Sequence, residues 1–398
     1  MPNPTTSNPI ALDDALRAGL DALRERDLER TLRIVTRREG ALVETKHGTA
    51  VDFSSNDYLG LATNPHIAEA VAAAVREHGA GAGGSRLISG NNPEHVALER
   101  ELAEYFEAEA ALTFASGYAA NVGIIPAIVG RGDVIFADAL NHASLIDGCR
   151  LSRASVHIYP HLDATALAAL LREHRGSARR ALIVTDGLFS MDGDRAPIPD
   201  IVDLAKQFDA WTYVDDAHAV GVDGIEGRGT ASAARRQGQI DITVGTLGKA
   251  FGVAGAFVYG SSTLVQYLVN RARSFIFSTA MMPAQAAAAR TAVSMVRGEP
   301  VHRERLLANA IRMTRMLHGA GIKALGSAGS HIVPVLIGDA AAAVGAGAQL
   351  ASRGYLVGAL RPPTVPNGAS RLRITVSAAH TQLQIGGLAE TLAAILRQ

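Results

Sequence analysis

The stretch "DITVGTLGKAFGVAGAFVYG" (residues 241–260) holds two short apolar runs on either side of a glycine-rich segment with one lysine, Lys249. Apolar runs that are rich in β-branched and aromatic residues and bounded by glycine are typical of buried strands. Lys249 has almost no polar neighbours in the sequence, so its amine either reaches solvent or takes part in chemistry. Loss of water favours the neutral form of an amine, which is the nucleophilic one.

Similar apolar runs recur from about residue 65 to about residue 290, and most are separated by helical patterns. The runs are "ALTFA", "DVIFAD", "SVHIYP", "RALIVTD" and "WTYVDD", with helical segments such as "DATALAALLREHR" and "IPDIVDLAKQFD" between them. Near-continuous apolar strands between helices predict an α/β fold with a mainly parallel sheet sandwiched by helices. Such a sheet binds its ligand at the carboxyl ends of the strands.

Changes in the pattern along the chain predict three segments. Leucine recurs at three- and four-residue spacings over residues 11–34, so residues 1–50 are predicted to be an N-terminal helical segment. Residues 51–296 form the predicted large α/β domain. A long helical pattern, several short strands and a final helix then predict a small C-terminal α+β domain over residues 297–398.

Composition excludes several classes of protein. Lys+Arg and Asp+Glu both number 38, so a net charge of zero gives no basis for binding nucleic acid or an anionic membrane. The single cysteine, Cys149, cannot form an internal disulfide or a metal cluster. No apolar run approaches the roughly 20 residues of a membrane helix, and the first residues lack a signal-peptide pattern. We therefore expect a cytoplasmic protein without a metal centre.

Two glycine-rich segments resemble nucleotide-binding motifs but lack their context. "GAGAGG" (residues 79–84) fits G-x-G-x-x-G, yet it follows a helical pattern, whereas the dinucleotide fingerprint needs a strand before it and a helix after it. Around Lys249, a P-loop would require glycine at Thr243 and serine or threonine at Ala250. Both a NAD-binding protein and a P-loop protein are disfavoured.

Four features at predicted strand ends match the needs of one cofactor. Asp215 is the first aspartate of "WTYVDD", His142 follows "DVIFAD", and Ser116-Gly117-Tyr118 opens a helix after "ALTFA". Each is weak alone, because a lone histidine is more often structural and a strand–turn–helix with glycine is common. Pyridoxal 5′-phosphate needs a lysine, a carboxylate at its pyridine nitrogen, a stacking ring and a phosphate cup. Lys249, Asp215, His142 and the helix start at Gly117 fill these four roles.

A series of motifs resembles the α-oxoamine synthases, a family of fold-type I pyridoxal phosphate enzymes, over nearly the whole chain from about residue 11. The motifs, in the family's order, are "FSSNDYLGL", "GAGGSR", "SGYAAN", "NHASLIDG", "FSMDGD", "VDDAHAVG", "TLGKAFG" and "FSTAMMP". The resemblance implies a pyridoxal phosphate-dependent acyltransferase that forms a homodimer with shared active sites.

The loop "RPPTVP" (residues 361–366) is most similar to one subgroup of this family. Members of that subgroup condense L-alanine with pimeloyl-CoA, or with a pimeloyl carrier thioester, in biotin biosynthesis. Other members of the family, namely 2-amino-3-ketobutyrate CoA ligase, 5-aminolevulinate synthase and serine palmitoyltransferase, remain open. The acyl chain length and the choice between CoA and a carrier protein also remain open.

The resemblance also implies roles for individual residues. Lys249 matches the Schiff-base lysine, Asp215 the partner of the pyridine nitrogen, and His142 the stacking ring. Further cofactor contacts match Gly117, Tyr118, Ser190, His218 and Thr246, with Ser278 and Thr279 reaching the neighbouring subunit's phosphate. Asn56 and Arg361 match residues around the amino-acid carboxylate, and Arg30 resembles an acyl-CoA-side arginine. Because a non-catalytic carrier would lack this substrate clamp, an enzyme is favoured.

Overall fold

A seven-stranded sheet forms the centre of the molecule in the computed structural model, which describes residues 11–397. β10 is antiparallel to both of its neighbours, and the other neighbouring strands are parallel to each other. The predicted α/β fold with a mainly parallel sheet is confirmed. In spatial order the strands are β4 (Ala110–Phe114), β10 (Ala256–Gly260), β9 (Ile242–Thr246), β8 (Trp211–Asp215), β7 (Ala181–Asp186), β5 (Val134–Asp138) and β6 (Ser155–Tyr159).

Helices cover both faces of this sheet because successive side chains of each strand point to opposite sides. Leu182 and Val184 of β7 pack with one set of helices, and Ile183 packs with the other. The first set is α4 (Gly117–Ile128), α5 (Ala143–Ser152) and α9 (Ser262–Arg271). The second set is α6 (Ala164–His174) and α7 (Ile198–Gln207), continued beside β10 by α3 (Pro93–Phe106) and α11 (Pro283–Gly298).

A smaller sheet lies in the C-terminal part of the chain. Its antiparallel strands, in the order β11 (Ile332–Gly338), β14 (Ser370–Thr375) and β13 (Gly358–Leu360), share a core with three helices. Those helices are α12 (Val301–Gly319), α13 (Ala340–Ser352) and α14 (Gln382–Leu396). The remaining helices are α2 (Pro65–His78), which packs against α11, and the short α8 (Thr230–Ala233) and α10 (Arg273–Ile276).

The N-terminal part differs from its prediction. Helix α1 (Leu12–Arg24) is shorter than the predicted helix over residues 11–34, because Asp27 takes a left-handed backbone conformation (φ 54°) that a helix cannot continue through. Beyond it the chain forms strands β1 (Val35–Glu39), β2 (Leu42–Thr45) and β3 (Gly48–Asp52). The prediction that residues 1–50 are helical therefore holds only for α1: residues 25–34 form a turn and irregular chain, residues 35–50 form strands and turns, and the first ten residues lie outside the described part of the chain.

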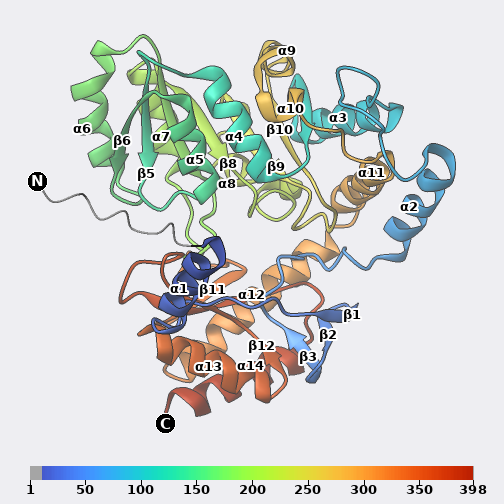
Figure 1. The fold of residues 1–398 in the computed structure, drawn as a ribbon, viewed down its shortest axis with the longest axis vertical. Helices are drawn as coiled ribbons and strands as arrows, with labels where there is room; N and C mark the ends of the chain where they lie inside the picture. The colour runs from blue at the N-terminus through green and yellow to red at the C-terminus, as the bar shows by residue number, and fades with distance from the viewer. Residues whose placement is uncertain (1–10, 398) are drawn as a thin grey trace, which may run out of the picture.

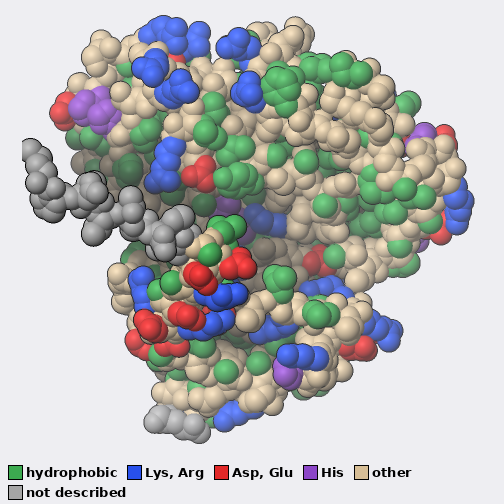
Figure 2. All heavy atoms as spheres, viewed as in Figure 1, with side chains coloured by type: hydrophobic (Ala, Val, Ile, Leu, Met, Phe, Trp, Pro, Cys, Tyr) green, Lys and Arg blue, Asp and Glu red, His purple; other side chains and the backbone are tan. Residues whose placement is uncertain are grey.

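These N-terminal strands belong spatially to the C-terminal part of the molecule. β3 pairs in parallel with β12 (Tyr355–Leu356), with Val51 opposite Tyr355. Figure 1 shows the N-terminal elements beside the C-terminal helices and below the large sheet. A recess between the two parts is visible in Figure 2, with His and Lys or Arg side chains along it. Within residues 11–397, no helix combines the length and apolar character that a membrane-spanning segment needs.

Candidate active site

Lys249 lies in the turn after β9, at the carboxyl edge of the parallel strands. Its Nζ is 2.8 Å from Nε2 of His218. Burial lowers the pKa of Lys249 to about 8, against the opposing effect of the Asp215 and Asp186 carboxylates. The turn requires glycine at Gly252 (φ +67°), where a Cβ would lie 2.5 Å from the backbone nitrogen of Ala62. The small residues around Lys249 therefore allow this turn to approach the "SSNDYLGL" segment closely.

His218 connects Lys249 to a buried tyrosine that the sequence analysis missed. Nδ1 of His218 is 2.6 Å from Oη of Tyr58, which also donates to Oδ1 of Asn56 at 3.2 Å. Burial, together with the nearby charge of Lys249, holds the pKa of His218 well below its usual range. A neutral imidazole carries one ring proton, so it can donate to one neighbour while it accepts from the other. Lys249, His218 and Tyr58 thus form a hydrogen-bonded chain.

Asp215 is the last residue of β8, and its carboxylate is held by donors. Oδ2 accepts from Nδ2 of Asn121 at 2.6 Å, and Oδ1 accepts from the backbone nitrogen of Ala217 at 3.0 Å. Asn121 is fully buried in α4, and its Oδ1 accepts from Oη of Tyr213 at 2.7 Å. The sequence analysis quoted the motif "SGYAAN" but missed Asn121, although a buried amide in an otherwise apolar helix is a usable signal.

His142 lies immediately before α5, at the end of the loop that follows β5. Its backbone nitrogen donates to Oδ2 of Asp186 at 2.7 Å, and its Nδ1 accepts from the backbone nitrogen of Ser144 at 3.3 Å. The side chain is exposed on one side, yet surrounding atoms remove enough water to lower the pKa of His142. Its imidazole is therefore neutral near pH 7, and its position is fixed through the backbone.

Helix α4 begins at Gly117, at the carboxyl edge of β4. The first N–H groups of any helix have no intrahelical partners. Here Oγ of Ser116 accepts from the backbone nitrogen of Ala119 at 3.1 Å, and the N–H groups of Gly117 and Tyr118 stay available. A Cβ at Gly117 would meet nothing within 4 Å, so the space before the helix is open. Tyr118 is 50% exposed, and its hydroxyl donates to Oδ2 of Asp147 at 2.8 Å. Such a helix start is suited to binding phosphate.

Two other groups of predicted cofactor residues have different surroundings. Oγ1 of Thr246 donates to the carbonyl of Gly255 and accepts from the nitrogen of Gly248, so it shapes the turn that holds Lys249. Ser278 and Thr279 lie in the loop between α10 and α11, and together with Arg86 they line a small hollow. Among the hydrogen bonds of the described residues, none joins Ser278 or Thr279 to the residues around Lys249.

A third residue missed from the sequence, Arg373, lies against Asn56. The residue is buried, with 8% of its surface exposed. Nη1 of Arg373 donates to Oδ1 of Asn56 at 3.3 Å and to Oγ1 of Thr375 at 2.8 Å, while its Nε donates to the carbonyl of Ser190. Alternating arginines in the apolar strand "RLRIT" were the available signal, because arginine is rarely buried unless it is paired.

The predicted substrate residues Arg361 and Arg30 both bond between the segment after α1 and the loop that holds Arg361. Nη2 of Arg361 donates to the carbonyl of Glu29 at 2.7 Å, and Nη2 of Arg30 donates to Oγ1 of Thr364 at 3.4 Å. These contacts join the segment after α1 to the "RPPTVP" loop. Among the hydrogen bonds of the described residues, Asn56 is joined to Arg373 and not to Arg361. The role of Arg361 at the amino-acid carboxylate stays a prediction.

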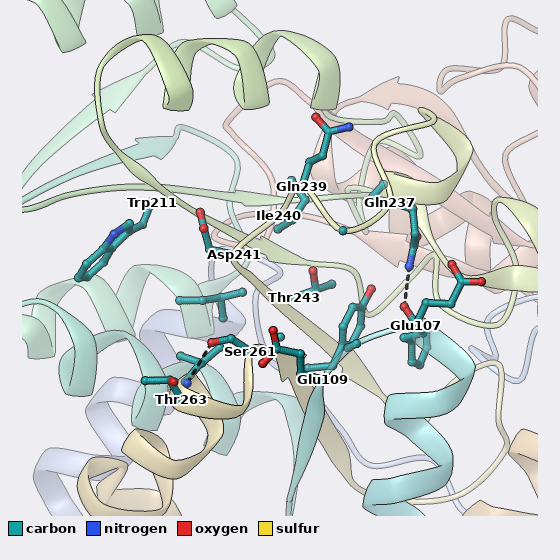
Figure 3. A pocket seen from close by; sticks show the side chains of 18 of the residues that line it. Glu107, Glu109, Trp211, Gln237, Gln239, Ile240, Asp241, Thr243, Ser261 and Thr263 are labelled. Atoms are coloured by element: carbon teal, nitrogen blue, oxygen red, sulfur yellow. Dashed lines mark hydrogen bonds between the residues drawn. The ribbon is translucent and has the colours of Figure 1, made fainter.

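A pocket of about 600 Å³ lies at the opposite end of the sheet (Figure 3). It is bounded by the amino ends of β8 and β9, where Trp211, Asp241 and Ile242 lie. It contains none of the predicted site residues. The chemistry-bearing side chains thus gather at the carboxyl ends of the strands, as the open-sheet rule requires.

Comparison with known proteins identifies the family. A model of the family described as "Aminotransferase class I and II" matches residues 49–392, and the chain belongs to this family. It is 50% identical to the 8-amino-7-oxononanoate synthase of Geobacter sulfurreducens, over 91% of this chain and 93% of the relative. It is 47% identical to the enzyme of that name from Alkalilimnicola ehrlichii, over 98% of this chain and 100% of the relative.

Solved structures share the fold. A serine palmitoyltransferase from S. paucimobilis, with a bound PLP–myriocin aldimine, matches with a TM-score of 0.92 and 29% identity over 98% of this chain and 99% of its own. An 8-amino-7-oxononanoate synthase from Francisella tularensis matches with a TM-score of 0.76 and 28% identity, over 87% and 98% of the two chains. The resemblance to α-oxoamine synthases and to the fold-type I architecture is confirmed.

The chain is therefore an enzyme that uses pyridoxal phosphate as its cofactor. The arrangement of its residues fits that group. A lysine amine with a lowered pKa and a carboxylate held only by donors, Lys249 and Asp215, lie at one edge of the sheet. The open helix start at Gly117 lies at the same edge.

Proposed function

We propose that the chain catalyses the decarboxylative condensation of L-alanine with pimeloyl-CoA, or with a pimeloyl carrier thioester, in biotin biosynthesis. The products are 8-amino-7-oxononanoate, CoA or the free carrier, and CO2. The observation that carries the proposal is the position of the Lys249 amine, buried at the carboxyl edge of the strands and 2.8 Å from Nε2 of His218. Burial and the charge of Arg373 lower the pKa of this amine to about 8, although the charge of Asp215 raises it. The relatives of that name at 47–50% identity support the choice of substrates. We also propose a homodimer located in the cytoplasm.

The cofactor would be held by residues from several strand ends. Lys249 would bond to its aldehyde, and Asp215 would keep the pyridine nitrogen protonated. The first N–H groups of α4, at Gly117 and Tyr118, would bind the phosphate, and His142 would lie against the ring. When bound, pyridoxal phosphate supplies an electron-withdrawing ring that stabilises negative charge on the α-carbon of the amino acid. Ser278 and Thr279 would serve the phosphate of the neighbouring subunit.

Lys249 would also move protons once L-alanine has displaced it. A pKa of about 8 leaves about one tenth of the amine neutral at pH 7, far more than for an ordinary lysine, and the neutral amine can accept the α-proton of the substrate. His218 holds this amine at 2.8 Å and is itself held by Tyr58, which fixes the direction of the amine. After CO2 has left, the protonated Lys249 would return a proton to the same carbon.

The amino-acid carboxylate would bind to Arg373 and Asn56. A guanidinium can bind a carboxylate through two parallel hydrogen bonds, and the burial of Arg373 strengthens this interaction. Fixing the carboxylate sets which bond of the α-carbon stands out of the plane of the ring, and therefore which bond breaks. Arg361 and Arg30, joined by the contacts with Glu29 and Thr364, would face the acyl thioester.

Substituting lysine for these two arginines separates their roles. Arg373→Lys should raise the KM for L-alanine by about 10–100-fold, because lysine keeps the charge but loses the paired hydrogen bonds. Arg361→Lys should change that KM by less than about threefold and act mainly on the thioester. Steady-state kinetics with each substrate varied in turn measures both effects, with cofactor absorbance as the check on integrity. A larger effect of Arg361→Lys on the KM for L-alanine would contradict the assignment.

Product analysis tests the proposed function directly. The purified holoenzyme should release free thiol from pimeloyl-CoA only when L-alanine is present, and mass spectrometry should detect 8-amino-7-oxononanoate. Glycine and L-serine, each with other acyl-CoA donors, test the related family activities. Faster thiol release with glycine or L-serine than with L-alanine would replace the proposal with one of those activities.

A further inference from the structure

The loop after β7, residues 188–196, is a tight hairpin that we name the FSMDGD loop. Leu188 pairs with Arg195, the backbone nitrogen of Phe189 donates to the carbonyl of Asp194, and that of Gly193 donates to the carbonyl of Phe189. The carbonyl of Ser190, in the same loop, accepts from Nε of Arg373. The loop is therefore in direct contact with the arginine that we assign to the amino-acid carboxylate.

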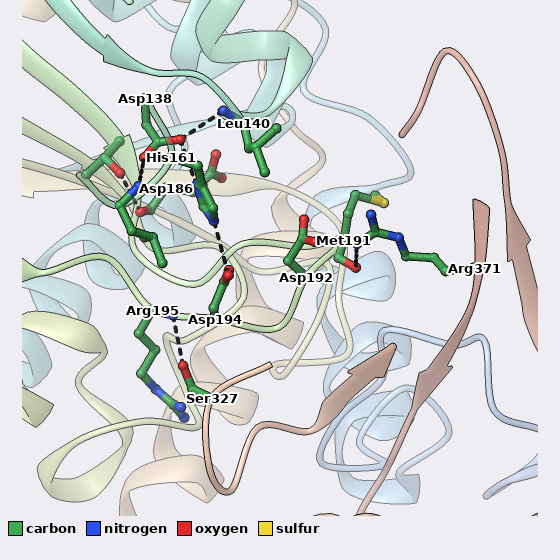
Figure 4. A network of polar contacts seen from close by, with 12 residues as sticks. Asp138, Leu140, His161, Asp186, Met191, Asp192, Asp194, Arg195, Ser327 and Arg371 are labelled. Atoms are coloured by element: carbon green, nitrogen blue, oxygen red, sulfur yellow. Dashed lines mark hydrogen bonds and ion pairs between the residues drawn. The ribbon is translucent and has the colours of Figure 1, made fainter. Parts of the chain in front are cut away.

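The C-terminal part of the molecule holds one side of the FSMDGD loop. Arg371, two residues before Arg373 on β14, donates to the carboxylate of Asp192 and, at 3.3 Å, to the carbonyl of Met191 (Figure 4). The backbone nitrogen of Ser327 donates to the carbonyl of Gly193 at 3.0 Å. These contacts tie the tip of the loop to β14 and to the segment before β11.

His161 holds the other side. Its Nε2 is 3.1 Å from Oδ2 of Asp194, and its Nδ1 is 2.9 Å from Oδ1 of Asp138 at the end of β5 (Figure 4). The ring also packs edge-on against Phe189, with 4.4 Å between ring centroids. Oδ1 of Asp194 is buried and has no hydrogen-bond partner within residues 11–397. Among the described residues, His161 is therefore the one hydrogen-bond partner of the Asp194 carboxylate.

The His161 ring forms ion pairs with two carboxylates, those of Asp138 and Asp194. Burial lowers the pKa of His161, but the hydrogen bonds to Asp138 and Asp194 outweigh it and raise the pKa to about 10. The imidazole is thus protonated at neutral pH and donates to both carboxylates. Arg195 and Asp223 form a separate bidentate pair at the end of the loop, so loss of His161 would free the tip without detaching the whole loop.

We propose that His161 is a positioning residue: it holds the tip of the FSMDGD loop on the large sheet, and through Ser190 it keeps Arg373 aligned with the amino-acid carboxylate. The inference rests on the proposed function only in taking the amino acid as the ligand of Arg373. A merely structural ion pair would affect stability and leave the binding of the amino acid unchanged.

His161→Asn tests the inference, because the shorter amide reaches Asp138 but not Asp194. The matched control is His157→Asn, in strand β6 four residues before His161, where the ring stacks on His174 with centroids 3.7 Å apart. Hydrogen exchange of the cofactor-free chain should be faster in residues 188–196 of His161→Asn. In the holoenzyme the KM for L-alanine should rise about tenfold with kcat changed less than about threefold. His157→Asn should match the wild type in both measurements.

Asp194→Asn provides a second route if His161→Asn folds poorly. It should give the same exchange pattern and the same rise in KM, and the double variant should add little to either single one. Unchanged exchange in residues 188–196, an unchanged KM, or additive effects of the two substitutions would each overturn the inference. If the wild type fails to use L-alanine, the proposed function falls, whereas the exchange measurement still decides whether His161 holds the loop.

Discussion

Lys249→Ala is expected to abolish turnover, with a loss of at least about 10⁴-fold in kcat. Alanine removes both the amine that bonds to the cofactor and the base that moves the α-proton. The visible absorbance band that pyridoxal phosphate acquires when it bonds to a lysine should disappear as well. The fold should survive, because the described contacts of Nζ amount to a single hydrogen bond with His218.

A matched control for this variant is Lys206→Ala, since Nζ of Lys206 donates to Gln239 at 2.8 Å, in an exposed position in the last turn of α7. It should keep both wild-type kcat and the absorbance band. Steady-state turnover by Lys249→Ala above about 1% of the wild-type rate would contradict the role assigned to this lysine.

Asp215→Asn should lower kcat by about 10²–10⁴-fold, since removing one partner of a buried charge pair costs about 3–5 kcal/mol. Asparagine has nearly the same shape, and its one oxygen can keep the hydrogen bond from Asn121 or the one from the backbone nitrogen of Ala217. It lacks the negative charge that would keep the pyridine nitrogen protonated. Affinity for pyridoxal phosphate, measured by titration of the cofactor-free chain, should fall much less than kcat.

The neighbouring carboxylate supplies the control. Asp216 contacts Thr230 through both oxygens, and burial raises the pKa of Asp216 to about 7. Asn in its place can keep both hydrogen bonds, so Asp216→Asn should retain kcat within about threefold of the wild type. Equal losses of kcat in the two variants would mean that the charge of Asp215 has no special function.

The residue pattern within each strand and helix was enough to predict the central sheet and the edge of it at which the site lies. The apolar runs that became β5, β7, β8 and β9 are buried on both faces, and burial of this kind leaves a clear signature in the sequence. Because parallel strands end at one edge, the positions of His142, Asp215 and Lys249 near each other followed from chain order alone.

Features that depend on distant pairing left weaker signals. Strand β1, with the sequence "VTRRE", has no apolar alternation, and it is defined by pairing with β2. The alternating arginines of "RLRIT" mark Arg373 as unusual for a core strand, but its place beside Asn56, more than 300 residues away in the chain, is set by the fold. Tyr58 and Asn121 were missed for the same reason, since their partners His218 and Asp215 come from other strand ends.

The chain has only four lysines, which allows a direct test of the central claim that Lys249 bonds to the cofactor. Holoenzyme reduced with borohydride, digested and analysed by peptide mass spectrometry should carry the phosphopyridoxyl group on Lys249. Stoichiometric labelling of Lys46, Lys206 or Lys323, with Lys249 unmodified, would contradict the account.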